Sequence, residues 1–221
     1  MERAYLSTYE NRTYSDSPTR SRYAVSWTSL FIKRSFDIIL AVISSLLLSP
    51  LIATISLLIA IRDGRPVVFA QKRVGRNGKE FILYKFRTMR IDAESDGRAR
   101  LCADGDSRLT PLGKFLRRHH LDELPQLWNV LRGDMSFVGH RPERKVFINE
   151  ISGLNPDYSK LYVLRPGLFS YATLYNGYTD TMEKMLRRLK MDLDYLHRRN
   201  LLMDCKIIFL TAFFIISGKK F

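Results

Sequence analysis

One stretch of the sequence, residues 117–134, reads RRHHLDELPQLWNVLRGD, and the rest of the chain is best understood outward from it. Two adjacent carboxylates, Asp122 and Glu123, stand just before Pro125, a residue that the first turn of a helix accommodates. Apolar residues then recur at helical spacing, and Gly133 is typical of a residue that ends a helix. We therefore expect the carboxylate pair at a helix N-terminus, where the macrodipole favours negative charge.

Two interpretations of this pair are open. Acidic residues before a helix often do no more than complement its dipole, and the local composition alone favours that interpretation. Arg117 and Arg118 directly precede the pair, however, so a carboxylate pair, a basic wall and a helix start could together handle a metal-bound phosphate.

The composition indicates one domain, or one domain with appendages, and an anionic partner. The chain has 221 residues and a net charge of +14, which fits nucleic acid, an anionic membrane or phosphorylated substrates. Cys102 and Cys205 provide neither a disulfide framework nor paired metal ligands, so a reduced, cytoplasmic setting fits best. The sequence contains no P-loop, no dinucleotide-binding fingerprint and no H-E-x-x-H motif.

A long apolar segment follows a flexible N-terminal arm, residues 1–30, which is rich in Ser, Thr, Tyr and Arg. No charge occurs from Ile38 to Ile61, a run of 24 residues. A straight helix of that length would measure roughly 36 Å, enough to cross a bilayer.

Two features favour a re-entrant helix over residues 31–62. Ser49 and Pro50 lie at its middle, and proline kinks a helix. Basic residues flank it on both sides, with Lys33 and Arg34 before it, and the positive-inside rule places both flanks in the cytoplasm. We expect Lys33, Arg34 and Asp37 to anchor the helix at the interface, with Asp37 pairing with the two cations. An ordinary kinked single-pass anchor is the alternative.

The segments 67–74 and 79–87 predict a β-hairpin, because Asn77-Gly78 is a strong type I′ turn signal. Lys85 and Arg87 share one face of the second strand and could line an anionic site. Farther along, Asp104 and Asp106 form a D-x-D pattern within an irregular acidic segment, a weak metal-binding signal. Near the C-terminus, residues 182–196 predict an amphipathic helix with a basic outer face, and residues 207–217 an interfacial or buried helix.

The order of several short motifs resembles the bacterial sugar transferases, the monotopic polyprenyl-phosphate phosphoglycosyl transferases. The resemblance covers roughly residues 31–212. Its markers are Lys33 to Asp37, Ser49-Pro50, Gln71 to Gly75, Tyr84 to Met89, Asp106 to Thr110, Leu121 to Leu127, Gly133 to Ser136, Arg165 to Gly167 and Asp192 to Tyr195.

This resemblance implies an enzyme held in one leaflet on the cytoplasmic face of the bacterial inner membrane. It implies transfer of a sugar 1-phosphate from a UDP-sugar to polyprenyl (undecaprenyl) phosphate, with release of UMP, as the first membrane step of surface polysaccharide or glycoconjugate synthesis. Nucleic acid is not an expected partner. The oligomeric state is left open, with a homodimer as one candidate.

The resemblance also implies roles for individual residues. Asp122 would be the nucleophile, forming a phosphoaspartyl intermediate, and would contact Mg²⁺, while Glu123 would position or deprotonate the lipid phosphate. Lys85, Arg117 and Arg141 would contact phosphate. Two departures affect this transfer of roles: the family turn is typically G-P-R-P but reads Gly-His-Arg-Pro here, with His140 at the second position, and Leu168 to Tyr171 replace the residues that usually follow Arg-Pro-Gly.

The resulting expectation is a mostly helical α+β protein. It would combine the re-entrant helix with a small cytoplasmic catalytic domain, residues 63–221, containing a β-hairpin and interfacial amphipathic helices. Two other functions are weighed against it: a metal-dependent glycosyltransferase that uses Asp104 and Asp106 and releases UDP, and a non-enzymatic basic protein that binds anionic membranes or nucleic acid.

Overall fold

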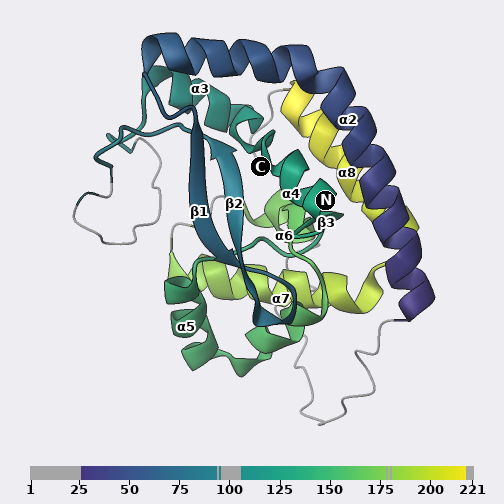
Figure 1. Ribbon diagram of the computed structural model, residues 1–221. Coiled ribbons are helices and arrows are strands. Elements are labelled where there is room, and N and C mark those ends of the chain that lie inside the picture. The colour runs from purple at the N-terminus through teal and green to yellow at the C-terminus, as the bar shows by residue number, and fades with distance from the viewer. Residues whose placement is uncertain (1–25, 94, 96–105, 178, 180, 218–221) are drawn as a thin grey trace.

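The computed structural model describes residues 26–93, 95, 106–177, 179 and 181–217. In this part of the chain the protein is mostly helical, with a β-hairpin and one short parallel strand pair, which confirms the expected α+β class (Figure 1). Residues 1–25 of the predicted arm, as well as Cys102 and Asp104, lie outside the described residues. The last residues of the predicted arm begin the first described helix, α2 (Trp27–Arg62).

Helix α2 runs for 36 residues through Ser49 and Pro50 without interruption and bends along its length (Figure 1). Pro50 has no N–H to donate to the carbonyl oxygen of Leu46, four residues earlier. The hydroxyl of Ser49 donates to that oxygen at 2.8 Å and so replaces the missing bond. The Ser-Pro pair therefore allows a bend without leaving a backbone acceptor bare in an apolar helix.

Most of the α2 surface is exposed and apolar. Its buried residues are Asp37, Ala41, Ile55 and Ile59. Among the described residues, α2 is the one helix that is long and apolar enough to cross a membrane. An apolar surface of this extent needs a cover that the other described residues do not provide.

Asp37 is buried against the body of the protein, residues 63–217. Its carboxylate accepts hydrogen bonds from the Ser136 hydroxyl and the Phe137 amide, each at 3.0 Å, and the side chain is 2% exposed. Donors from a neighbouring strand therefore take the place of the predicted direct pairing with Lys33 and Arg34, although the Lys33 charge still acts on the carboxylate.

Lys33 and Arg34 also bind the body of the protein. The Lys33 ammonium donates to the Asp204 carboxylate at 2.6 Å. The Arg34 guanidinium donates to the carbonyl oxygens of Val130 and Leu131 at 2.6 and 2.9 Å. The three residues predicted as interface anchors therefore connect the N-terminal half of α2 to three different elements of the body of the protein.

The predicted hairpin is confirmed. Strand β1 (Val68–Val74) pairs antiparallel with β2 (Glu80–Phe86). Between them, Asn77 and Gly78 both have positive φ, 58° and 71°, and the Lys79 amide donates to the Arg76 carbonyl across the turn. These are the backbone angles that make Asn-Gly the preferred pair of a type I′ turn.

The acidic pair lies in a one-turn 3₁₀ helix, η3 (Leu121–Glu123), between two short α-helices, α3 (Pro111–Arg118) and α4 (Gln126–Arg132). Gly133 ends α4 with a φ of 89°, as predicted. One detail differs: Trp128 is 57% exposed, although its spacing had placed it with the apolar residues of the helix.

The second strand pair was not predicted. Strands β3 (Ser136–Val138) and β4 (Gly167–Phe169) run parallel, with Ser136 opposite Gly167. Each has three residues, too few to show an alternating pattern. The pair brings the Arg-Pro-Gly segment beside the turn that carries Arg141.

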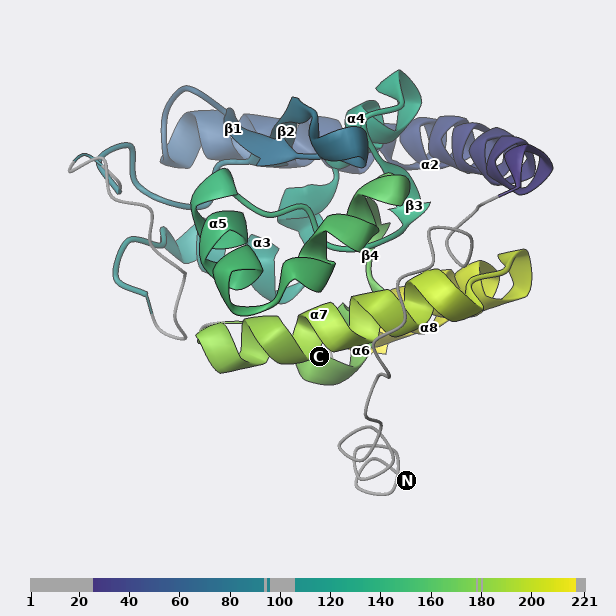
Figure 2. The ribbon, with the colours of Figure 1, turned by 90° about the horizontal axis from the view of Figure 1, so that it is seen from below.

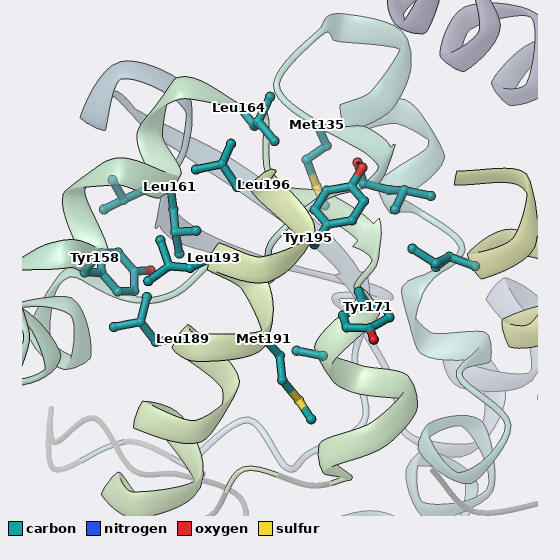
Figure 3. Close-up of a cluster of buried hydrophobic side chains, with 14 of the residues drawn as sticks. Met135, Tyr158, Leu161, Leu164, Tyr171, Leu189, Met191, Leu193, Tyr195 and Leu196 are labelled. Carbon is teal, nitrogen blue, oxygen red and sulfur yellow. Dashed lines mark hydrogen bonds between the residues drawn. The ribbon is translucent and has the colours of Figure 1, made fainter. Parts of the chain in front are cut away.

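The C-terminal half supplies most of the core. Its elements are α5 (Lys145–Leu154), the 3₁₀ helix η4 (Pro156–Val163), α6 (Tyr171–Asn176), α7 (Met182–Arg198) and α8 (Leu201–Ser217). Helix α7 lies on the opposite side of the molecule from α2 (Figure 2). Leu189, Leu193 and Leu196 of α7 pack against Tyr158, Leu161 and Leu164 (Figure 3).

The predicted amphipathic pattern of α7 is interrupted at Arg188 and ends before residues 191–196, all of which are buried. Met185, Leu189, Leu193 and Leu196 are buried as expected. Arg188, which was assigned to the basic outer face, is only 6% exposed and forms an ion pair with Glu143. An ion pair inside the protein interrupts the pattern because the helix is covered on more than one side.

Replacing Asp37 by Ala should destabilise the protein, because it leaves the Phe137 amide buried without an acceptor, while the Ser136 hydroxyl can still donate to the Val138 carbonyl oxygen. The expected loss is about 1–3 kcal/mol of unfolding free energy for the orphaned amide. Thermal unfolding in detergent micelles measures it. As a control, Thr54→Ala, an exposed change on the same helix, should have little effect; equal stability of the two variants would contradict the assignment.

Candidate active site

Asp122 and Glu123 are both buried beside cations from other elements. They are 5% and 8% exposed. The Lys85 ammonium, from β2, donates to Glu123 Oε1 at 2.6 Å, and both terminal nitrogens of Arg141 lie 3.4 Å from the same oxygen. Helix α4 has only seven residues, so these side-chain cations rather than a helix dipole compensate most of the acidic charge.

The two carboxylates differ in how fully they are engaged. Burial alone would raise the pKa of Glu123, but Lys85 and Arg141 hold it well below the ordinary value, so this group is ionised. Asp122 lies 3.9 Å from Lys85 and has no side-chain hydrogen bond in the described residues. Burial raises the pKa of Asp122, and Lys85 opposes that shift only in part. Asp122 is thus the carboxylate with lone pairs available to a ligand.

Arg117, one of the predicted phosphate contacts, lies at the edge of the acidic pair. Its Nε donates to the Thr88 hydroxyl at 3.0 Å, and its charge lowers the pKa of Asp122. The structure thus brings Lys85, Arg117 and Arg141 to the pair from β2, α3 and the turn after β3.

Arg87, the fourth predicted phosphate contact, does not reach the pair. Its Nη2 donates to the carbonyl oxygens of Asp63 and Gly64, at the C-terminal end of α2. Its Nε and Nη1 are buried and have no hydrogen-bond partner in the described residues. Arg87 follows the last residue of β2, and the carbonyls at the end of α2 bind one edge of its guanidinium.

The turn that presents Arg141 is fixed by close backbone contact. A Cβ on Gly139 would lie 2.5 Å from the Arg165 carbonyl oxygen, and one on Gly167 would lie 2.1 Å from the Gly139 amide nitrogen. The Gly167 amide donates to the His140 carbonyl at 2.8 Å. Only glycine permits this approach at both positions.

His140 replaces the proline of the family turn without loosening it. Its side chain is 3% exposed, and burial lowers its pKa to about 4, so the imidazole is neutral at physiological pH. The backbone freedom expected from this substitution is therefore removed by packing and by the bond to Gly167.

A buried ion-pair network also supports the turn that carries Arg141. Arg73 donates to the Pro142 carbonyl and to Glu143, at 3.1 and 3.3 Å. Glu143 accepts a second bond, at 2.5 Å, from Arg188. Sequence patterns gave no sign of this network, because its members come from β1, the turn and α7, and each looks like an ordinary surface residue in its own segment.

The donor set at the pair suits Mg²⁺ only in part. No group of three or more His, Cys, Asp or Glu residues that could hold a metal is present in the described residues. Mg²⁺ commonly uses one or two carboxylates and completes its shell with substrate phosphates and water. The unengaged carboxylate of Asp122 meets that requirement. By contrast, Asp106, the described half of the D-x-D pattern, is held by Arg108 through several hydrogen bonds.

Asp192 is a further buried acid that the sequence analysis had not singled out as a functional residue. It accepts a hydrogen bond from the Ser170 hydroxyl at 3.0 Å. Burial raises its pKa to about 7, although Arg188 and the Ser170 hydroxyl lower it. Asp192 lies beside the ion-pair network that supports the Arg141 turn. Because its pKa is raised, the folded protein has a group that titrates near neutral pH.

This titration predicts the pH dependence of stability. An unfolded aspartate releases its proton near pH 4, whereas the folded chain retains it to about pH 7. The unfolded state therefore binds fewer protons, and the unfolding free energy falls as pH rises from about 4 to about 7, on the order of 1.4 kcal/mol per pKa unit. Asp192→Asn should remove that fall and be the more stable protein at pH 8.

Denaturant unfolding at pH 5 and pH 8 measures the difference between wild type and variant. Asp157→Asn, at a surface carboxylate paired with Lys160, is the matched control and should leave the wild-type pH dependence unchanged. Parallel pH curves for wild type and Asp192→Asn would show that Asp192 is ionised throughout.

Comparison with known proteins identifies the family to which this chain is similar. The bacterial sugar transferase family model matches residues 28–218. An N-acetylgalactosaminephosphotransferase of Aeromonas hydrophila, named as acting on UDP-N-acetylgalactosamine and undecaprenyl phosphate, is 39% identical over 188 residues, 85% of this chain and 44% of the relative.

Two further relatives have names of the same kind. The UDP-glucose:undecaprenyl-phosphate glucose-1-phosphate transferase of Escherichia coli is 39% identical over 191 residues, 86% of this chain and 41% of the relative. A putative undecaprenyl-phosphate N-acetylgalactosaminyl 1-phosphate transferase of Bacillus subtilis is 47% identical over 131 residues, 59% of this chain and 73% of the relative. The chain spans less than half the length of the first two relatives. With the family match covering nearly all described residues, this chain belongs to the bacterial sugar transferase family.

Proposed function

We propose that this protein transfers a sugar 1-phosphate from a UDP-sugar to polyprenyl (undecaprenyl) phosphate and releases UMP. The observation that carries this proposal is the buried acidic pair, in which Lys85 and Arg141 neutralise Glu123, while Asp122 has only a 3.9 Å ion pair with Lys85 and no side-chain hydrogen bond among the described residues. The named relatives act on undecaprenyl phosphate, and two of them on UDP-sugars. Both substrates are anionic, as the net charge of +14 requires of a partner.

In the proposed mechanism, a carboxylate oxygen of Asp122 attacks the phosphorus that bears the sugar. A P–O bond forms, the bond to the UMP oxygen breaks, and UMP leaves with that electron pair. An oxygen of the lipid phosphate then attacks the same phosphorus and displaces Asp122, giving the polyprenyl diphosphate sugar. Carboxylates act as covalent nucleophiles toward phosphoryl groups, and splitting the transfer this way lets one pocket serve both substrates in turn.

The remaining residues balance charge. Lys85, Arg117 and Arg141 lie where the phosphoryl oxygens gain negative charge, and fixed cations in a site of low water content stabilise such charge strongly. Glu123, kept ionised by its two cations, would orient those cations and the incoming lipid phosphate. Mg²⁺ held by Asp122 and the diphosphate would supply positive charge that keeps Asp122 ionised despite its burial.

We propose further that α2 is re-entrant and that the protein resides on the cytoplasmic face of the bacterial inner membrane. Both ends of α2 bind the same body: Lys33 and Arg34 near its start, and Asp63 at its end, where the Thr110 hydroxyl donates to the Asp63 carboxylate at 2.9 Å. A helix that crossed the bilayer would have its ends on opposite sides, where one small body does not reach both.

The first test is nucleotide release. Protein, Mg²⁺ and undecaprenyl phosphate are mixed with a panel of UDP-sugars, and UMP is expected with one or a few of them. Asp122→Asn should lower that rate more than about a thousandfold, as removal of a nucleophile does. Glu80→Gln, at an exposed carboxylate, should retain the wild-type rate. UDP as the product, or a fully active Asp122→Asn variant, would overturn the mechanism.

The topology is tested by cysteine labelling. In a chain whose native cysteines are replaced by Ser, Trp27→Cys and Arg62→Cys introduce single thiols at exposed positions near the two ends of α2. An impermeant maleimide should reach neither in intact spheroplasts and both after lysis. A separate variant that keeps Cys205 as its single cysteine is the control for the cytoplasmic side, because this residue is exposed on the body of the protein. Labelling of Trp27→Cys in intact spheroplasts would instead establish a single-pass helix.

A further inference from the structure

A fully buried amide on α4 lies close to the acidic pair without touching it. Asn129 is 0% exposed and comes six residues after Glu123, on the helix that directly follows the pair. Burying an amide costs free energy unless each of its polar atoms finds a partner. Leucine would fill a similar volume at no such cost, so the amide calls for a reason beyond packing.

Its partners are backbone groups of the strand that carries Lys85. Asn129 Oδ1 accepts from the Tyr84 amide at 3.1 Å, and Nδ2 donates to the Ile82 carbonyl oxygen at 2.7 Å. A third contact joins Nδ2 to Asp134 at 3.3 Å. All polar atoms of the side chain are therefore paired.

These two backbone groups lie on the open edge of the hairpin. In an antiparallel pair, alternate residues direct their N–H and C=O groups toward the partner strand and the others direct theirs away. The Ile82 and Tyr84 groups bound by Asn129 face away from β1, since β2 is hydrogen-bonded to β1 through the residues between them. One side-chain amide thus occupies the place that another strand would take along this edge.

The consequence concerns Lys85, the neighbour of Tyr84. Strand β2 is held by β1 on one edge and by Asn129 on the other, and Asn129 belongs to the same continuous segment as Glu123. We propose that Asn129 is a positioning residue that sets the strand register and thereby places the Lys85 ammonium on Glu123, an inference that rests on the proposed transfer of phosphosugar at this pair.

Register is the property that this contact controls best. The Oδ1 acceptor and the Nδ2 donor of Asn129 match one N–H and one C=O that lie two residues apart on β2. If β2 slipped by one residue relative to α4, neither backbone group would face Asn129. The same slip would turn Lys85 to the opposite face of the strand, because side chains alternate along it. Apolar packing between α4 and β2 would allow such a slip more easily, since it has no directional preference.

The test compares two substitutions of Asn129 with two controls. Asn129→Leu keeps the volume and removes both backbone contacts, while Asn129→Asp keeps the acceptor for Tyr84 and loses the donor to Ile82. Val130→Ala lowers stability at the next position, which is also 0% exposed, and removes neither hydrogen bond between Asn129 and β2. Asp134→Ala removes the third contact of Asn129 together with the Arg132–Asp134 ion pair, and it leaves both bonds from Asn129 to β2 in place.

UMP release per folded molecule and hydrogen exchange in the peptide 80–87 are measured for each variant. Asn129→Leu is expected to lower kcat about a hundredfold, the scale of an ångström-sized misplacement, with KM for the UDP-sugar changed less than about threefold. The kcat of Asn129→Asp should lie between those of Asn129→Leu and wild type. Exchange in the peptide should accelerate in both, but not in Val130→Ala or Asp134→Ala.

Three outcomes would overturn the proposal. In the first, Asn129→Leu has the same activity per folded molecule as Val130→Ala, so the effect is one of stability alone. In the second, Asp134→Ala loses as much kcat as Asn129→Leu, which would assign the effect to the third contact. In the third, exchange of the hairpin peptide is unchanged. Failure of the wild-type protein to release UMP would be a separate result: it would overturn the proposed function, and the inference with it.

Discussion

The site depends on removing two adjacent carboxylates from water, which is costly unless cations or hydrogen bonds compensate their charge. Lys85 and Arg141 provide that compensation for Glu123 and leave Asp122 with a raised pKa. Much of the remaining architecture can be understood as support for these two cations: the hairpin and Asn129 hold Lys85, and the β3–β4 pair with the Arg73–Glu143–Arg188 network holds the turn of Arg141.

The long apolar helix α2 is connected to the same site through a short path. Arg34 of α2 binds the carbonyls of Val130 and Leu131 in α4, and the acidic pair ends two residues before α4 begins. A seven-residue helix therefore separates Arg34 from the residues proposed to react. If α2 lies in a membrane, as proposed, its depth there would also determine the height of the acidic pair above the lipid.

Motifs with local causes were predictable from the sequence. The Asn-Gly turn, the glycine that ends α4 and the long apolar helix each depend on neighbours in the chain, so their patterns are visible without a structure. Lys85, Arg117 and Arg141 were brought to the pair as the family resemblance implied. Their roles toward substrate remain predictions.

What could not be predicted depends on contacts between distant segments. Asp37 looked like a partner of Lys33 and Arg34 because it lies one turn away, but a strand about a hundred residues later provides better donors. Arg188 looked like part of a basic surface until Glu143 was found opposite it. Asn129, in the middle of an apolar helix pattern, gave no sign of its role, because its partners are backbone groups, which have no sequence signature.

The contact of Gly139 with Gly167 has a consequence for how the family can vary. The backbone path of the Arg141 turn is fixed by the contact between Gly139 and Gly167, which have no side chains. The residue at position 140 therefore does not have to restrict the backbone itself. Proline stiffens a turn through its own ring, but here the stiffness comes from the neighbouring segment, and a histidine is accommodated. Variation at position 140 should thus be tolerated over evolutionary time, whereas either glycine should change only together with the segment that it faces.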